Sequence, residues 1–122
     1  MKKILIIEDD AAMSLTLGDN LVHEGFEIAR AKDGEEGLLL ALHTKPDLIL
    51  LDVLLPKMDG LALLNKLRED EWGRSVPVII LSNLSTPANV ASAIGSDVHQ
   101  YLVKVDWKME DVIKKIQERL KI

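Results

Sequence analysis

The chain alternates five times between a short apolar run and a segment whose apolar residues recur at helical spacing. The five apolar runs are residues 3–7, 26–30, 48–51, 78–81 and 100–103. Strands that alternate with helices form a parallel sheet with helices on both faces, and nearly continuous apolar strands agree with burial on both faces. Because 122 residues suit one domain, we expect a single doubly wound α/β domain of three layers over residues 1–122.

Start and stop signals set the bounds of the expected helices. These are residues 11–23, a second helix between Asp33 and Pro46, residues 60–70, a short fourth helix from about 86 to 95, and a last helix with its apolar face on Met109, Val112, Ile113, Ile116 and Leu120. Asp33 and Glu36 have the spacing of a capping box, which predicts that Asp33 caps the second helix. Asp10 is expected to cap the first helix.

Polar and charged side chains follow four of the five apolar runs. They are Glu8, Asp9 and Asp10 after the first run, Asp52 after the third, Ser82 and Asn83 after the fourth, and Lys104 after the fifth. In doubly wound sheets, ligands bind beyond the carboxyl ends of the strands. Several carboxylates at one edge repel one another unless a cation binds among them. The pattern therefore predicts a divalent metal and chemistry at Asp52.

Composition excludes several other classes of function. The net charge is −5, and aromatic residues make up 3 % of the chain, so neither phosphate neutralisation nor base stacking is favoured, and we expect no direct binding of nucleic acid. No apolar run approaches the roughly 18 residues of a membrane helix. The chain contains no cysteine, which agrees with an expected cytoplasmic location.

The same residues resemble a response-regulator receiver domain of two-component signalling, over the whole chain. The resemblance rests on four motifs in order: Glu8-Asp9-Asp10, residues 50–60 around Asp52, Ser82 at the end of Val-Ile-Ile-Leu-Ser, and Tyr101-Leu-Val-Lys104. It implies a flavodoxin-like fold, in which a five-stranded parallel sheet has the order 2-1-3-4-5.

The resemblance also implies a role for each carboxylate. Asp52 would accept a phosphoryl group from the phosphohistidine of a sensor histidine kinase or a phosphotransfer protein. Glu8, Asp9, Asp52 and the backbone carbonyl of Leu54 would hold Mg²⁺, an ion that binds oxygen ligands and keeps several waters. The domain would not be an enzyme in its own right, but would assist its own phosphorylation and dephosphorylation.

Three further residues would respond to the phosphoryl group. By the same resemblance, Ser82 would hydrogen-bond to it, Lys104 would form an ion pair with it, and Tyr101 would turn inward when Ser82 moves. This switch would change a surface that contacts a downstream protein or effector domain of unknown identity. A phosphorylation-dependent homodimer is a further expectation.

Several positions depart from the family pattern. Val105 stands where the family usually has proline, and a cis bond before a non-proline residue costs about 2.5–4 kcal/mol, so we expect a trans Lys104–Val105 bond. Asn83 replaces a usually small residue, and it would either narrow access to Asp52 or add a hydrogen bond to the phosphoryl group. Leu54 and Leu84 occupy positions that tune phosphoryl lifetime. Neither apolar side chain can orient an attacking water, so we expect a long-lived phosphoryl group.

Other functions compete with this interpretation. A pseudo-receiver would be an interaction module that never accepts a phosphoryl group, and the departures at Asn83 and Val105 favour it slightly. A phosphatase of the aspartyl-phosphate type would carry a second aspartate where this chain has Leu54. A flavin carrier would need a phosphate-binding loop after the first strand, where Glu8, Asp9 and Asp10 would repel a phosphate.

Overall fold

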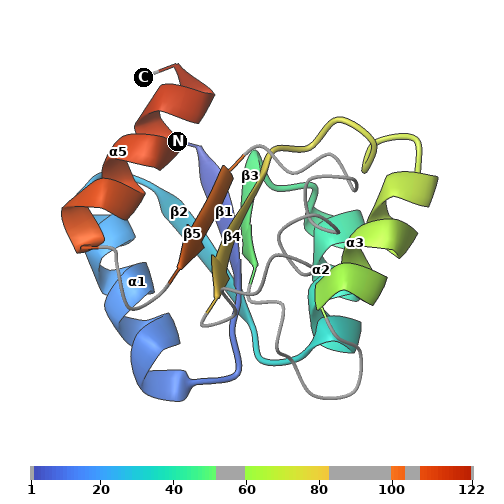
Figure 1. Ribbon diagram of the computed structural model, residues 1–122, viewed down its shortest axis with the longest axis horizontal. Helices are drawn as coiled ribbons and strands as arrows, with labels where there is room; N and C mark the ends of the chain where they lie inside the picture. The colour runs from blue at the N-terminus through green and yellow to red at the C-terminus, as the bar shows by residue number, and fades with distance from the viewer. Residues whose placement is uncertain (1, 52–59, 83–99, 104–107, 122) are drawn as a thin grey trace.

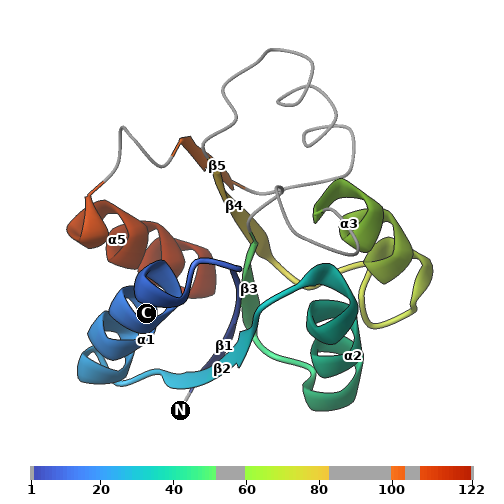
Figure 2. The ribbon, with the colours of Figure 1, turned by 90° about the horizontal axis from the view of Figure 1, so that it is seen from below.

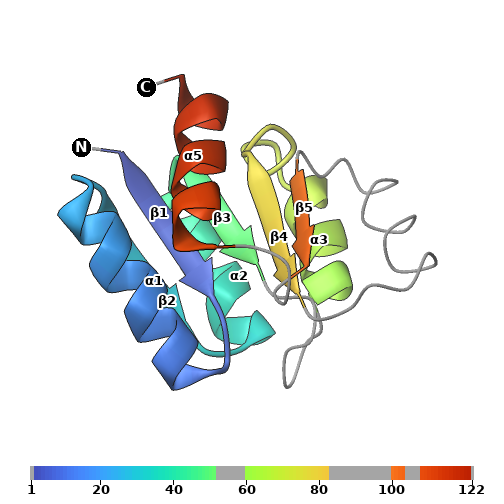
Figure 3. The same ribbon diagram turned by 60° about the vertical axis from the view of Figure 1, so that its left-hand side comes forward.

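The computed structural model of the chain describes residues 2–51, 60–82, 100–103 and 108–121. Five strands lie in one sheet: β1 (Lys3–Ile7), β2 (Glu27–Ala31), β3 (Leu48–Leu51), β4 (Val78–Ser82) and β5 (Gln100–Val103). All neighbouring strands are parallel, in the order β2-β1-β3-β4-β5. The expected sheet and strand order are confirmed, and Figure 3 shows the arrows pointing the same way.

Four helices in the described part of the chain cover the sheet. They are α1 (Ala11–His23), α2 (Gly34–Thr44), α3 (Gly60–Glu69) and α5 (Met109–Leu120). Helices α1 and α5 lie on one face and α2 and α3 on the other, which confirms the three layers (Figures 1 and 2). The short helix expected at about residues 86–95 lies outside the described residues.

Alternate residues of β1, an interior strand of the sheet, belong to two separate hydrophobic clusters. Ile4 and Ile6 pack in the cluster that includes residues of α1 and α5, whereas Leu5 and Ile7 pack in the cluster that includes residues of α2 and α3. All four side chains are fully buried. Because successive side chains of a strand point to opposite faces, a strand that is apolar at every position requires a helical layer on each side.

Helix α5 covers part of the face shared with α1. Val112 and Ile116 are fully buried there, and Met109, Ile113 and Leu120 pack against the same cluster. The last four of these residues follow Met109 by three, four, seven and eleven positions, so all five share one side of the helix. The apolar face expected for the last helix is therefore confirmed.

Aspartate side chains fix the starts of α1 and α2. Asp10 Oδ1 accepts a hydrogen bond from the Met13 amide at 3.1 Å, and Asp33 Oδ1 accepts one from the Glu36 amide at 2.8 Å, so both expected caps are confirmed. The Glu36 carboxylate, however, accepts from the amide of Lys32 at 3.0 Å, one residue before the cap. Lys32 is the first residue past β2, so its amide needs an acceptor outside the strand ladder, and Glu36 supplies it.

Three strand bounds, two in β2 and one in β4, differ by one residue from those that the sequence indicates. Phe26 is not part of β2, because its amide donates to the Leu21 carbonyl at the end of α1, at 3.0 Å, and its side chain is buried in the core. At the other end of β2, Ala31 belongs to the strand. Ser82 pairs with Val103 and is the last residue of β4 rather than the first residue after it.

The buried cap of α2 gives a testable prediction for stability. Asp33→Ala is expected to lower the free energy of unfolding by about 1–2 kcal/mol, because the Glu36 amide loses its acceptor where water has little access. The Asp33 residue is 4 % exposed. Asp10→Ala is the matched control, since it removes an exposed cap and should cost about 1 kcal/mol or less. Urea unfolding measures both, and a smaller loss at Asp33 than at Asp10 would contradict the prediction.

The connection from α3 to β4 folds back against the end of its own helix. Arg68 Nη1 donates to the carbonyls of Gly73 and Val76 at 2.6 and 2.8 Å, and Asp70 Oδ2 accepts from the Gly73 amide at 3.0 Å. A Cβ atom at Gly73 would overlap the Leu67 carbonyl oxygen and lie 2.9 Å from the Leu67 carbonyl carbon. The turn therefore requires glycine because two backbone segments approach closely.

Candidate functional site

The carboxyl ends of β1, β3, β4 and β5 lie at one edge of the sheet. Ile7 is in register with Leu51, and Ser82 is in register with Val103. The residues that follow these four in the sequence are Glu8, Asp52, Asn83 and Lys104. The strand ends that precede the predicted site residues are therefore brought to the same edge by the register of the sheet.

Glu8 and Asp9 are the predicted metal ligands whose side chains the structure describes. Glu8 is 4 % exposed, and its amide donates to the Ala31 carbonyl at 3.0 Å, which holds it beside the end of β2. Asp9 is exposed. Two carboxylates at the sheet edge provide oxygen ligands of the kind that Mg²⁺ binds. Within the described ranges no three His, Cys, Asp or Glu residues form a metal site, so the predicted set depends on Asp52.

The remaining predicted site residues are described in part or lie elsewhere in the chain. The backbones of Ser82 and Tyr101 occupy the last position of β4 and the second position of β5. Asp52, Leu54, Asn83, Leu84, Lys104 and the Lys104–Val105 peptide bond lie outside the described residues. Their roles, and the trans bond, stay predictions.

A cavity of about 490 Å³ lies beside this edge, between α1, the end of β2 and the start of α2. Its charged lining residues are Glu8, Asp9, Arg30, Lys32 and Glu36. The cavity therefore contains the two predicted metal ligands Glu8 and Asp9, and it places two cations beside them. Arg30 and Lys32 belong to none of the motifs that the sequence contains, and the one signal for them is their position on either side of Ala31, at the end of the second strand.

Comparison with known proteins identifies the family of the chain and relatives with the same fold. A family model described as the response regulator receiver domain matches residues 4–117. The chain is 36 % identical over 121 residues to the "DNA-binding dual master transcriptional regulator RpaA" of Synechocystis, which covers 99 % of this chain and 50 % of that protein. A CheY-like response regulator receiver domain protein from Methanospirillum hungatei is similar in structure, with a TM-score of 0.93, 28 % identity, and coverage of 99 % of this chain and 94 % of that one.

A second solved structure gives a similar result from another kind of protein. It is the signal receiver domain of a signal transduction histidine kinase from Syntrophus aciditrophicus, with a TM-score of 0.90, 30 % identity, and coverage of 99 % of this chain and 91 % of that one. The flavodoxin-like fold expected from the sequence is thereby confirmed.

The curated relatives are longer than this chain, which spans about half the length of those it matches. Several are named as DNA-binding regulators. The expectation that the chain does not bind nucleic acid directly therefore finds no support in these comparisons. None of the helices in the described ranges has the length and apolar character needed to cross a membrane.

Proposed function

Because this chain belongs to the response regulator receiver domain family, we propose that it accepts a phosphoryl group on Asp52, in an Mg²⁺-dependent transfer from the phosphohistidine of a sensor histidine kinase or a phosphotransfer protein. The observation that supports this most is the strand register. It makes the end of β3, which precedes Asp52, a direct neighbour of β1, which precedes Glu8 and Asp9. An acceptor carboxylate needs such neighbours, because phosphoryl transfer depends on positioning and charge neutralisation.

The chemistry assigns one task to each residue. A carboxylate oxygen of Asp52 attacks phosphorus in line with the leaving nitrogen of the donor, so a P–O bond forms as the P–N bond breaks. Glu8, Asp9, Asp52 and the Leu54 carbonyl would hold Mg²⁺, which neutralises phosphoryl oxygens when bound. Ser82 would donate a hydrogen bond to the phosphoryl group, and Lys104 would place a positive charge beside it.

The product would bias the surface of the domain. Phosphorylation exchanges about one negative charge for roughly two and adds acceptor oxygens, which would draw in Ser82 and allow Tyr101 to turn. The output would be contact with a downstream protein or an effector domain, or a homodimer, and in a longer protein the effector could be of the DNA-binding kind named for the relatives. We place the protein in the cytoplasm, in agreement with a chain that contains no cysteine.

A requirement for Mg²⁺ tests the proposal. After incubation with acetyl phosphate, intact-mass spectrometry is expected to show the gain of one phosphoryl group in the presence of Mg²⁺, and none after chelation of the metal. The physical reason is that the anionic donor must approach a cluster of carboxylates. No gain with Mg²⁺, even from a cognate kinase, would favour the pseudo-receiver instead. Where the phosphorylated product does form, its rate of decay would test the long lifetime expected from Leu54 and Leu84.

A further inference from the structure

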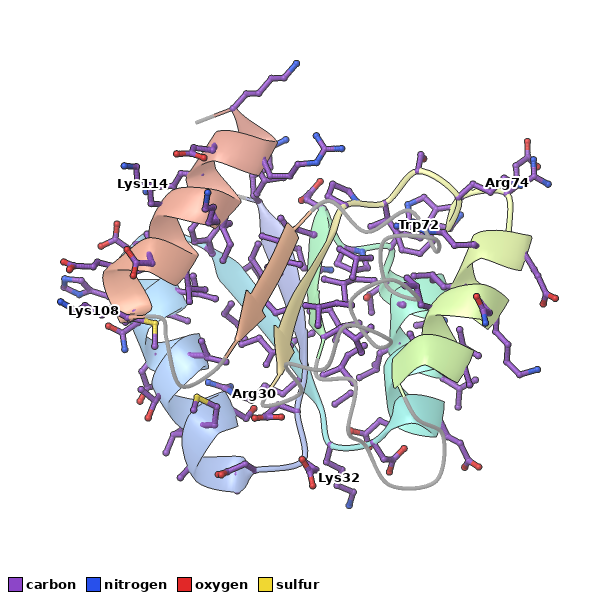
Figure 4. The ribbon with its side chains drawn as sticks, viewed as in Figure 1. Arg30, Lys32, Trp72, Arg74, Lys108 and Lys114 are labelled. Atoms are coloured by element: carbon purple, nitrogen blue, oxygen red, sulfur yellow. The ribbon has the colours of Figure 1, made fainter. Side chains whose placement is uncertain are left out.

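Two cationic side chains, Arg30 in β2 and Lys32 directly after it, line the cavity that contains Glu8 and Asp9. Arg30 is the fourth residue of β2, and Lys32 follows the strand. In Figure 4 both side chains lie in the lower half of the molecule, toward which the strand arrows point, whereas Arg74 and Lys114 lie in the upper half. The three carboxylates that line the cavity, Glu8, Asp9 and Glu36, are thus offset in part by two positive charges.

Arg30 is held along the surface of α1. Its Nε donates to the Ser14 carbonyl at 3.4 Å, and its Nη2 lies 3.9 Å from Asp19 Oδ1. The guanidinium lies over Gly18, where a Cβ atom would come within 2.6 Å of Arg30 Cζ. The absence of a side chain at residue 18 therefore makes room for the guanidinium. Its positive charge is partly offset by the carboxylate of Asp19 on α1.

The backbone of Lys32 is held by a hydrogen bond, whereas its side-chain ammonium forms no ion pair with the described residues. The amide donates to Glu36 Oε1 at 3.0 Å, which positions the residue at the start of α2. In the described part of the chain, no carboxylate lies within ion-pair distance of the Lys32 ammonium. An exposed ammonium beside carboxylates that it does not pair with acts on incoming ions through its field.

We propose that Lys32, with Arg30 beside it, is a specificity-determining residue that favours phosphodonors of higher negative charge and weakens the binding of Mg²⁺ to Glu8 and Asp9. The inference rests on the proposed function. Its physical basis is that one positive charge at this edge attracts an anion and repels a cation at the same time. The two effects must have opposite signs, which a purely structural role for Lys32 would not produce.

The test compares two donors and one metal in Lys32→Met. Acetyl phosphate carries two negative charges near neutral pH, and phosphoramidate carries a net charge one unit less negative. At low salt, the second-order rate of phosphorylation of the variant is expected to fall about three- to fivefold with acetyl phosphate and less than twofold with phosphoramidate, since exposed charges act over about a Debye length. The Kd for Mg²⁺, measured from the rise of Tm with metal concentration, is expected to fall about two- to threefold.

Two control variants sharpen the comparison. Lys114→Met removes the same charge from an exposed position on α5 and should leave both donors and the metal unchanged. Lys32→Arg keeps the charge and should behave as the wild type. Equal rate losses with both donors, or a Kd for Mg²⁺ that rises or stays the same in Lys32→Met, would overturn the inference while leaving the proposed function in place. A wild-type protein that gains no phosphoryl group would overturn both.

Discussion

Asp52→Asn is expected to abolish the gain of a phosphoryl group from acetyl phosphate at saturating Mg²⁺. An amide is nearly the same size as a carboxylate, so the fold should tolerate the change, but its neutral oxygen is a poor nucleophile. The variant also replaces a charged oxygen ligand proposed for the metal with a neutral amide oxygen, which binds Mg²⁺ more weakly, so the rise of Tm with Mg²⁺ should shrink. Intact-mass spectrometry measures the first effect, and thermal unfolding measures the second.

Asp10→Asn is the matched control for this substitution, because it changes a carboxylate in the acidic run that follows β1. The structure gives Asp10 a different task, since its side chain caps α1 by accepting from the Met13 amide. Asparagine is also a good N-cap, so this variant should fold and accept the phosphoryl group as the wild type does. Phosphorylation that persisted in Asp52→Asn, or that disappeared in Asp10→Asn, would mean that the acceptor had been assigned to the wrong residue.

Gly73→Ala is expected to lower the free energy of unfolding by about 3 kcal/mol, the upper end of what overpacking usually costs. The added Cβ would overlap the backbone carbonyl of Leu67, which cannot rotate away as a side chain would. Relief requires the turn to move away from α3, and that movement would stretch the hydrogen bonds from Arg68 to the carbonyls of Gly73 and Val76. Urea unfolding of the purified variant measures the loss.

Arg74→Ala provides the comparison from the same turn. Its side chain is exposed and points away from the molecule in Figure 4. Surface substitutions of this kind usually change stability by no more than about 0.5 kcal/mol. If Gly73→Ala were as mild as Arg74→Ala, the close approach of the turn to Leu67 would not exist in solution.

Sequence patterns located β1 and α1 to the residue because several signals agree there. The apolar run ends at Glu8, Asp10 supplies a cap, and Gly25, with φ of 95°, follows the end of the helix. The pattern was less informative at Phe26, because an aromatic residue suits either a strand or a core. Its place in the turn depends on a tertiary contact with the end of α1, which no local signal reports.

The cavity beside Glu8 shows where sequence reasoning stops. The edge of the sheet could be predicted from strand ends, because parallel strands share one direction. The path of a long side chain could not be predicted from the sequence. Arg30 lies over Gly18 only because α1 and β2 pack together. The Glu36 carboxylate likewise accepts from the amide of Lys32 rather than that of Asp33, because Lys32 is the first residue after β2 and its amide has no acceptor in the strand ladder. Flexible charged side chains follow the tertiary structure that surrounds them.

The position of α5 has a consequence for synthesis on the ribosome. All five strands and helices α1, α2 and α3 emerge before it, yet Val112 and Ile116 belong to the same buried cluster as Ile4 and Leu50. Until those last turns leave the exit tunnel, one apolar side of the nascent sheet lacks part of its cover and is open to chaperones and to other nascent chains. A peptide of residues 108–121 added in trans would be a natural means of rescuing a chain that stops early.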